Sequence, residues 1–128
     1  MNLHLIPLES NYTIHQLKKT ADFPLNLYQS GFFSITKTDD EISVITDSVH
    51  QFPSLNSSRG WKGFKVEGIL DFSLVGILYT LTKPLKENGI PVFVVSTFNT
   101  DYVFVKQEEF EKTIEILNAT ENITVVTG

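Results

Sequence analysis

The second half of the chain changes from one hydrophobic pattern to another. Residues 62–68 alternate apolar and polar side chains, which predicts a half-buried strand. From residue 73 to about residue 88, apolar side chains recur every three or four positions and predict one helical face, formed by Leu74, Ile77, Leu78, Leu81 and Leu85. Asp71 or Ser73 can cap the start of this helix, and Asn88-Gly89 supplies its stop.

The pattern then predicts two strands, a second helix and a final strand. Residues 90–95 read as a buried strand, and residues 102–106 as its returning partner after the polar turn 96–101. Residues 107–119 open with acidic side chains and carry a helical stripe, while residues 122–127 form a β-branched strand. The resulting β-α-β-β-α-β order predicts an α+β, ferredoxin-like fold with two helices on one face of an antiparallel sheet.

The first half is rich in strands and lacks a long helical stripe. Four segments read as strands, namely residues 3–8, 13–17, 32–37 and 42–46. Asp22–Tyr28 suits only a short turn or one helical turn, and residues 47–61, which are rich in turn-forming side chains, are the best linker candidate. We therefore divide the chain into a strand-rich N-terminal half, residues 1–58, and a ferredoxin-like domain, residues 59–128. We expect the first-half strands to pack against or extend the second-half sheet.

Composition and charge narrow the choice of partners. The chain has 128 residues, of which 41% are hydrophobic and ten are Phe, enough for one ordinary core or two small ones. The net charge is −5, and Arg59 is the only arginine. Nucleic-acid binders cluster Lys and Arg, and acidic membrane surfaces attract basic segments. We therefore expect neither nucleic acid nor a membrane as a partner.

The sequence lacks the residue patterns of most catalytic and metal-binding sites. The lack of cysteine excludes disulfides, thiolate zinc sites and a cysteine nucleophile. His4, His15 and His50 do not have metal-ligand spacing, and no local motif of a hydrolase or nucleotide-binding enzyme occurs. We expect no enzyme activity, no metal and no cofactor. The start of the chain lacks a signal peptide and no apolar run approaches 18 residues, which predicts a cytoplasmic protein.

Two loops could bind a small ligand. At the strand-to-helix junction before Gly76, unpaired N–H groups of the first helical turn would favour an anion, and Gly76 would let a ligand approach closely. In the hairpin loop, the side chains of residues 96–101 offer hydroxyls and a carboxylate for an ammonium group. Residue chemistry alone favours simpler roles, since Asp71 and Ser73 can merely cap the helix and the hairpin can be an ordinary polar turn.

Several strings in these segments resemble the ACT-domain proteins of the CASTOR-like type. They are Trp61 to Gly68 (WKGFKVEG), Leu70 to Gly76 (LDFSLVG), Gly89 to Phe93 (GIPVF) and Ser96 to Tyr102 (STFNTDY). The resemblance is densest from residue 59 to residue 117. It extends upstream through residues 31–38 and 41–44, which look like a companion N-terminal half.

This resemblance implies a ferredoxin-like ACT fold, pairing of ACT units side by side, and an amino acid bound at their interface. It implies that backbone amides of Leu74, Val75 and Gly76 hold the ligand's carboxylate, with Asp71 or Asp101 on its ammonium group. It also nominates Ser73 in the first loop, and Ser96, Thr97 and Thr100 in the hairpin. We thus expect a regulatory, amino-acid-binding homo-oligomer, most simply a homodimer.

Two other functions stay open at this point. The chain could be a structural interaction module that assembles through sheet edges or helix faces without a small ligand. An enzyme is the weakest interpretation, because no set of residues requires one. A structural module would form an oligomer that no amino acid alters, which distinguishes it from a sensor.

Overall fold

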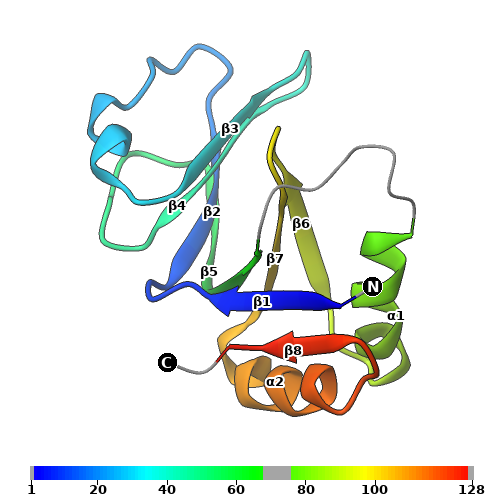
Figure 1. Ribbon diagram of the computed structural model, residues 1–128. Coiled ribbons are helices and arrows are strands. Elements are labelled where there is room, and N and C mark those ends of the chain that lie inside the picture. Colours follow the sequence, from blue (N-terminus) through cyan, green and yellow to red (C-terminus); the bar gives the residue numbers. More distant parts are fainter. Residues whose placement is uncertain (1, 68–75, 127–128) are drawn as a thin grey trace. The chain divides into compact units, whose positions relative to one another are not determined.

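The computed structural model describes residues 2–67 and 76–126 (Figure 1). The chain forms two compact units, the first made of Met1–Glu9 with Lys62–Gly128 and the second of Ser10–Trp61. The elements in chain order are β1 (Leu3–Pro7), β2 (Tyr12–Leu17), the 3-10 helix η1 (Leu25–Gln29), β3 (Phe33–Lys37), β4 (Ile42–Asp47), β5 (Asn56–Val66), α1 (Ile77–Glu87), β6 (Val92–Ser96), β7 (Asp101–Lys106), the 3-10 helix η2 (Gln107–Glu109), α2 (Phe110–Asn118) and β8 (Ile123–Val125). The first nine residues thus join the unit formed by the second half, which differs from the sequence-based division at residue 58.

The first unit confirms the predicted β-α-β-β-α-β order, as β5-α1-β6-β7-α2-β8. An additional strand lies inside its sheet, whose order is β8-β1-β5-β7-β6. β1 is antiparallel to β5, with Leu5 opposite Val66, and parallel to β8, with Leu5 opposite Val125. β1 and β8 run side by side in Figure 1. The N-terminal strand therefore completes the sheet of the ferredoxin-like unit.

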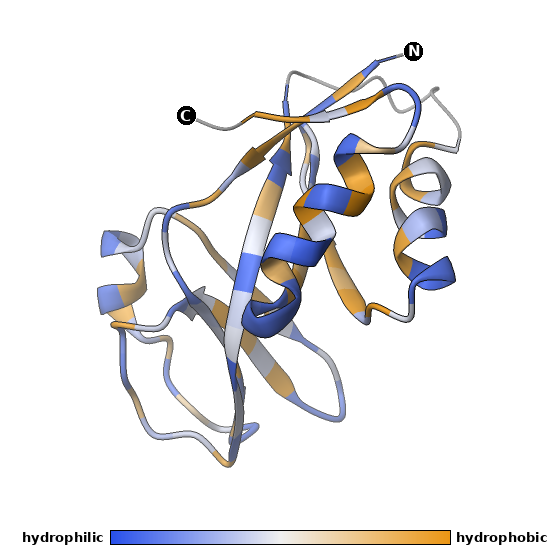
Figure 2. Cartoon of the chain, turned by 90° about the horizontal axis from the view of Figure 1, so that it is seen from below, coloured by the Kyte–Doolittle hydropathy of each residue, from blue (hydrophilic) through white to orange (hydrophobic). Residues whose placement is uncertain are grey.

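The two helices bury one face each in the core of this unit. Ile77, Leu81 and Leu85 of α1 are buried, as predicted, together with Leu117 of α2. They join one cluster with Phe64, Val66, Val103 and Val105 of the sheet. Each fully buried leucine contributes about 1.5–3 kcal/mol relative to an exposed one. In Figure 2 each helix shows hydrophobic and hydrophilic residues on different sides.

The edges of α1 differ from the sequence-based expectation in two respects. Leu78, predicted on the buried stripe, is 36% exposed and lies at its margin. The predicted caps Asp71 and Ser73 lie outside the described residues, and the residue that precedes α1 is Gly76. The predicted end is confirmed, because Asn88 follows Glu87 and Gly89 adopts a left-handed φ of 69°.

The second unit contains an antiparallel sheet in the order β3-β4-β2-β5. The four predicted first-half strands are confirmed, and η1 (Leu25–Gln29) overlaps Asp22–Tyr28, where a short turn or one helical turn was predicted. The prediction that residues 47–61 form a linker is wrong from Asn56 onward, because these residues begin β5 and pair with β2. Their Ser and Asn side chains are poor strand formers, and the neighbouring strand, not local preference, fixes this conformation.

Candidate ligand site

The hairpin between β6 and β7 is held closed by two threonines. The backbone N–H of Thr97 donates to the carbonyl oxygen of Thr100 at 2.8 Å, and the Thr97 hydroxyl donates to the same oxygen at 2.9 Å. In return, the Thr100 N–H donates to Thr97 Oγ1 at 3.2 Å. These bonds fix the turn, so the predicted site residues Thr97 and Thr100 have a structural task within their own chain.

A further bond from Thr100 attaches this hairpin to the end of β5. The Thr100 hydroxyl donates to the carbonyl oxygen of Val66 at 2.7 Å. Thr100 is 3% exposed, so water does not compete for this bond. Val66 is the last residue of β5 and comes shortly before residues 68–75. The hairpin is therefore fixed to the strand from which the first predicted loop departs.

Gly76 is the part of the first predicted loop that the structure describes. Its φ of 82° is left-handed, a conformation that costs other residues about 1–2 kcal/mol. Its carbonyl oxygen accepts two bonds from Thr80, one from the N–H and one from the hydroxyl, each 2.9 Å long. A Cβ built on Gly76 meets no atom of the described residues within 4 Å. Asp71, Ser73, Leu74 and Val75 lie outside the described residues.

The remaining hairpin candidates lie at the ends of the two strands. Ser96 and Asp101 are register partners, with Ser96 exposed and Asp101 half-buried. Phe98, at the tip between them, is 82% exposed, and the sequence analysis did not single it out. A large apolar side chain in a run of turn-forming residues was the available signal. The structure thus gathers Ser96, Thr97, Thr100 and Asp101 on one hairpin.

We also searched the described residues for a metal-binding cluster and for a membrane-spanning helix. Among residues 2–67 and 76–126, no group of three or more His, Asp or Glu side chains could hold a metal ion. No helix in the described part of the chain is long and apolar enough to cross a membrane. The hairpin carries hydroxyl groups and one carboxylate, which can form hydrogen bonds with a polar ligand.

Comparison with protein families identifies two matching regions. The family described as the ACT domain matches residues 56–119. A second family, described as an N-terminal domain, matches residues 10–49, which lie within the second structural unit.

Curated relatives match about two thirds of this chain at moderate identity. The cytosolic arginine sensor for mTORC1 subunit 1 of Rattus norvegicus is 33% identical over 94 residues, or 67% of this chain and 28% of its own length. The human protein of the same name is also 33% identical over 94 residues, 29% of its length. The chain therefore spans less than a third of the length of the curated relatives it matches.

Solved structures resemble the chain over nearly its whole length. A crystal structure of a protein from Agrobacterium tumefaciens has a TM-score of 0.89 and 32% identity, and the match covers 98% of this chain and 93% of that one. The aspartokinase alpha and beta subunits match with a TM-score of 0.62 and 14% identity, over 95% of this chain and 99% of theirs. The latter likeness supports the fold.

Proposed function

The chain belongs to the ACT domain family, and on this premise we propose that it is a non-enzymatic regulatory protein that binds an amino acid between paired ACT units. The relatives named as arginine sensors support the amino-acid part of this proposal. The fold shared with the aspartokinase subunits is consistent with a regulatory role. We also propose that this chain is cytosolic, because the relatives' name describes them as cytosolic.

In this proposal the ligand lies between the start of α1 and the β6–β7 hairpin. Backbone N–H groups of Leu74, Val75 and Gly76, which precede α1 in the sequence, hold its carboxylate, since the positive end of the helix dipole favours an anion there. Asp101, or Asp71, receives its ammonium group through a charge-assisted hydrogen bond. Ser73 and Ser96 add hydroxyls around the ligand.

One bond carries the proposal more than any other observation. The Thr100–Val66 hydrogen bond is buried and fixes the hairpin to the strand that leads into residues 68–75. The two loops nominated by the sequence therefore start from attached strands. A site whose two sides share a rigid support loses less conformational freedom when a ligand binds. Thr97 and Thr100 thereby support the site, while Asp101 supplies its charge.

The proposed assembly is a homodimer in which a second copy closes the site. A ligand placed between two ACT units gains contacts from both, and its binding then stabilises the pair. Light scattering with and without amino acids measures this link. An oligomer whose size and stability no amino acid alters would instead support a structural interaction module.

Thermal unfolding in the presence of each of the twenty amino acids tests ligand binding directly. A ligand at 100 times its Kd stabilises the protein by about 2.7 kcal/mol, which is readily measured as a rise in Tm. Calorimetric titration of any stabilising amino acid then compares Asp101→Asn with Glu111→Gln, an exposed carboxylate on α2. We expect loss of affinity in the first variant and none in the second. The absence of any rise in Tm at millimolar concentrations would contradict the proposal.

A further inference from the structure

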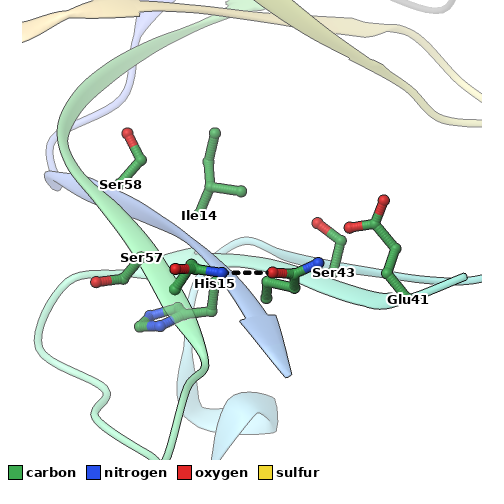
Figure 3. A pocket seen from close by; sticks show the side chains of 8 residues that line it. Ile14, His15, Glu41, Ser43, Ser57 and Ser58 are labelled. Carbon is green, nitrogen blue, oxygen red and sulfur yellow. Dashed lines mark hydrogen bonds between the residues drawn. The ribbon is translucent and has the colours of Figure 1, made fainter. Parts of the chain in front are cut away.

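The sheet of the second unit has one apolar face and one face that mixes polar and apolar side chains, the latter including Ile14 and its register partner Ile45. His15 of β2 is buried on the apolar face, which also carries Leu17 and Val44, and Leu27 of η1 joins these two in one hydrophobic cluster. Because successive side chains of a strand point to opposite sides, Ile14 and Gln16 lie on the other face. Figure 3 shows this arrangement, with the side chains of Ile14, Glu41, Ser43 and Ser58 on one side of the strands and the His15 ring and Ser57 on the other.

Strand register brings polar side chains into one row across this second face. Gln16 of β2 is paired with Ser43 of β4 and with Asn56 of β5. The Asn56 side-chain amide donates to Gln16 Oε1 at 2.7 Å, the dashed bond in Figure 3. One row further along, Ile14 is paired with Ser58. These side chains and Glu41 line a hollow of about 230 Å³.

The residue types in this row are not those that stabilise a sheet. Asn is depleted in strands, where β-branched side chains such as Thr and Val are favoured. Gln16, Ser43 and Ser58 are half-buried, and two of them have hydrogen-bond partners within the chain, since Gln16 Oε1 accepts from Asn56 and Ser58 Oγ accepts from Trp61 Nε1 at 3.0 Å. The row therefore presents a preformed amide pair at the surface of the sheet.

The charged side chain that lines the hollow is negative. Glu41 is the one carboxylate among the lining residues, and it is half-buried. Once Gln16 Oε1 has accepted from Asn56, the pair still offers Asn56 Oδ1 as an acceptor and Gln16 Nε2 as a donor. The chain's net charge of −5 also draws cations toward it. The hollow is smaller than the roughly 300–1,000 Å³ of pockets that take drug-sized ligands.

We propose that this hollow is a binding site for a small organic cation with N–H donors, a primary ammonium or guanidinium compound. Glu41 pairs with the positive charge, and Asn56 Oδ1 accepts a hydrogen bond from a ligand N–H group. Ile14 contacts its apolar part. The site lies wholly in the second unit, and the hairpin and the start of α1 belong to the first, so it stands independently of the amino-acid site proposed above.

Nuclear magnetic resonance titration of the full chain tests this site. The probes are putrescine and methylguanidinium, with choline as a cation of the same charge type that has no N–H donor. We expect saturable shifts of the Gln16 and Asn56 side-chain amides with the two N–H cations, and weaker or unsaturated shifts with choline. Equal saturable shifts with choline would overturn the hydrogen-bonding part of the proposal, and no saturable shift with any probe would overturn the site.

Two variants, each of which removes one carboxylate, test whether Glu41 supplies the charge that binds the ligand. Glu41→Gln keeps the size of the side chain and removes its charge, and we expect about tenfold weaker binding because a charge-assisted hydrogen bond becomes a neutral one. Asp22→Asn removes an exposed carboxylate from the same unit and should leave the affinity unchanged. Backbone shifts away from the hollow report that both variants keep the fold. Equal affinity in the Glu41 and Asp22 variants would overturn the assignment to this hollow.

Discussion

The hydroxyl of Thr100 donates to the carbonyl oxygen of Val66 at 2.7 Å and joins the β6–β7 hairpin to the last residue of β5. Val66 is fully buried, so its carbonyl oxygen has no water to replace this donor. One side chain thus satisfies a buried backbone group and sets the position of a loop. The same bond links fold stability to the proposed ligand site.

Thr100→Val tests this link, because valine keeps the shape of threonine and removes the donor. We expect a loss of about 1–3 kcal/mol in the free energy of unfolding, the cost of an unsatisfied buried carbonyl. Urea unfolding measures it. Thr82→Val is the control, since the Thr82 hydroxyl bonds to Leu78 on the exposed side of α1 and its loss should cost less than about 0.5 kcal/mol. Equal costs in the two variants would argue against the buried bond.

Gly76 carries a second prediction, which separates backbone strain from packing. A Cβ at this position meets no atom of the described part of the chain within 4 Å, so we expect Gly76→Ala to destabilise the fold through its φ of 82°, by about 1–2 kcal/mol. Gly76→Asn should cost less, because asparagine adopts left-handed conformations more readily. Thermal unfolding of both variants gives the order. A larger loss for asparagine than for alanine would show that space, not φ, limits this position.

The sequence predicts the helical half of the fold well because its signals are local. Leu81 and Leu85 repeat at the helical period, and both are buried on the same face of α1. The insertion of β1 between β5 and β8 has no such local signal. It depends on pairing between residues that are far apart in the chain, such as Leu5 and Val125, and alternation within a strand does not identify the partner strand.

The same limit applies to the candidate sites. Thr97 and Thr100 are candidate site residues because of their hydroxyl groups. In the structure, the Thr97 hydroxyl donates to the carbonyl oxygen of Thr100, and the Thr100 hydroxyl donates to the carbonyl oxygen of Val66. Composition reveals which groups are present but not which partners they already have. The row of Gln16, Ser43 and Asn56 was missed because its members come from three strands, and the turn chemistry around Asn56 favoured a linker.

Gly63 supports a third prediction, based on close packing in the first unit. A Cβ at Gly63 would lie 2.7 Å from Phe104 Cε1 and 2.9 Å from Leu8 Cδ1, and Phe104 is fully buried. Gly63→Ala should therefore cost about 1–3 kcal/mol through overpacking. Gly31→Ala is the matched control, because its Cβ meets nothing within 4 Å and it should change stability by less than about 0.5 kcal/mol. Denaturant unfolding distinguishes them, and equal stability would contradict the close approach.

His15 is the described group whose surroundings predict a pH dependence. The residue is 5% exposed, and its ring lies 4.4 Å from the Phe52 ring, measured between centroids. Nδ1 is hydrogen-bonded to Ser54 Oγ at 2.8 Å, and Nε2 has no hydrogen-bond partner among the described residues. Burial, and secondarily the positive charge of Arg59, lowers the pKa of His15 below its ordinary value of 6.5.

The sign of the pH effect follows from this lowered pKa. Below pH 6.5 the unfolded chain protonates His15 while the folded chain still excludes the proton, so stability falls as the pH decreases. Above pH 6.5 both states are neutral and the contribution of His15 is fully present. We expect unfolding free energies from urea titrations to fall just below pH 6.5 by up to about 1.4 kcal/mol per pH unit. His15→Gln should flatten this slope, whereas replacing the exposed His4 by Gln should preserve it, and an unchanged slope in His15→Gln would exclude His15 as its source.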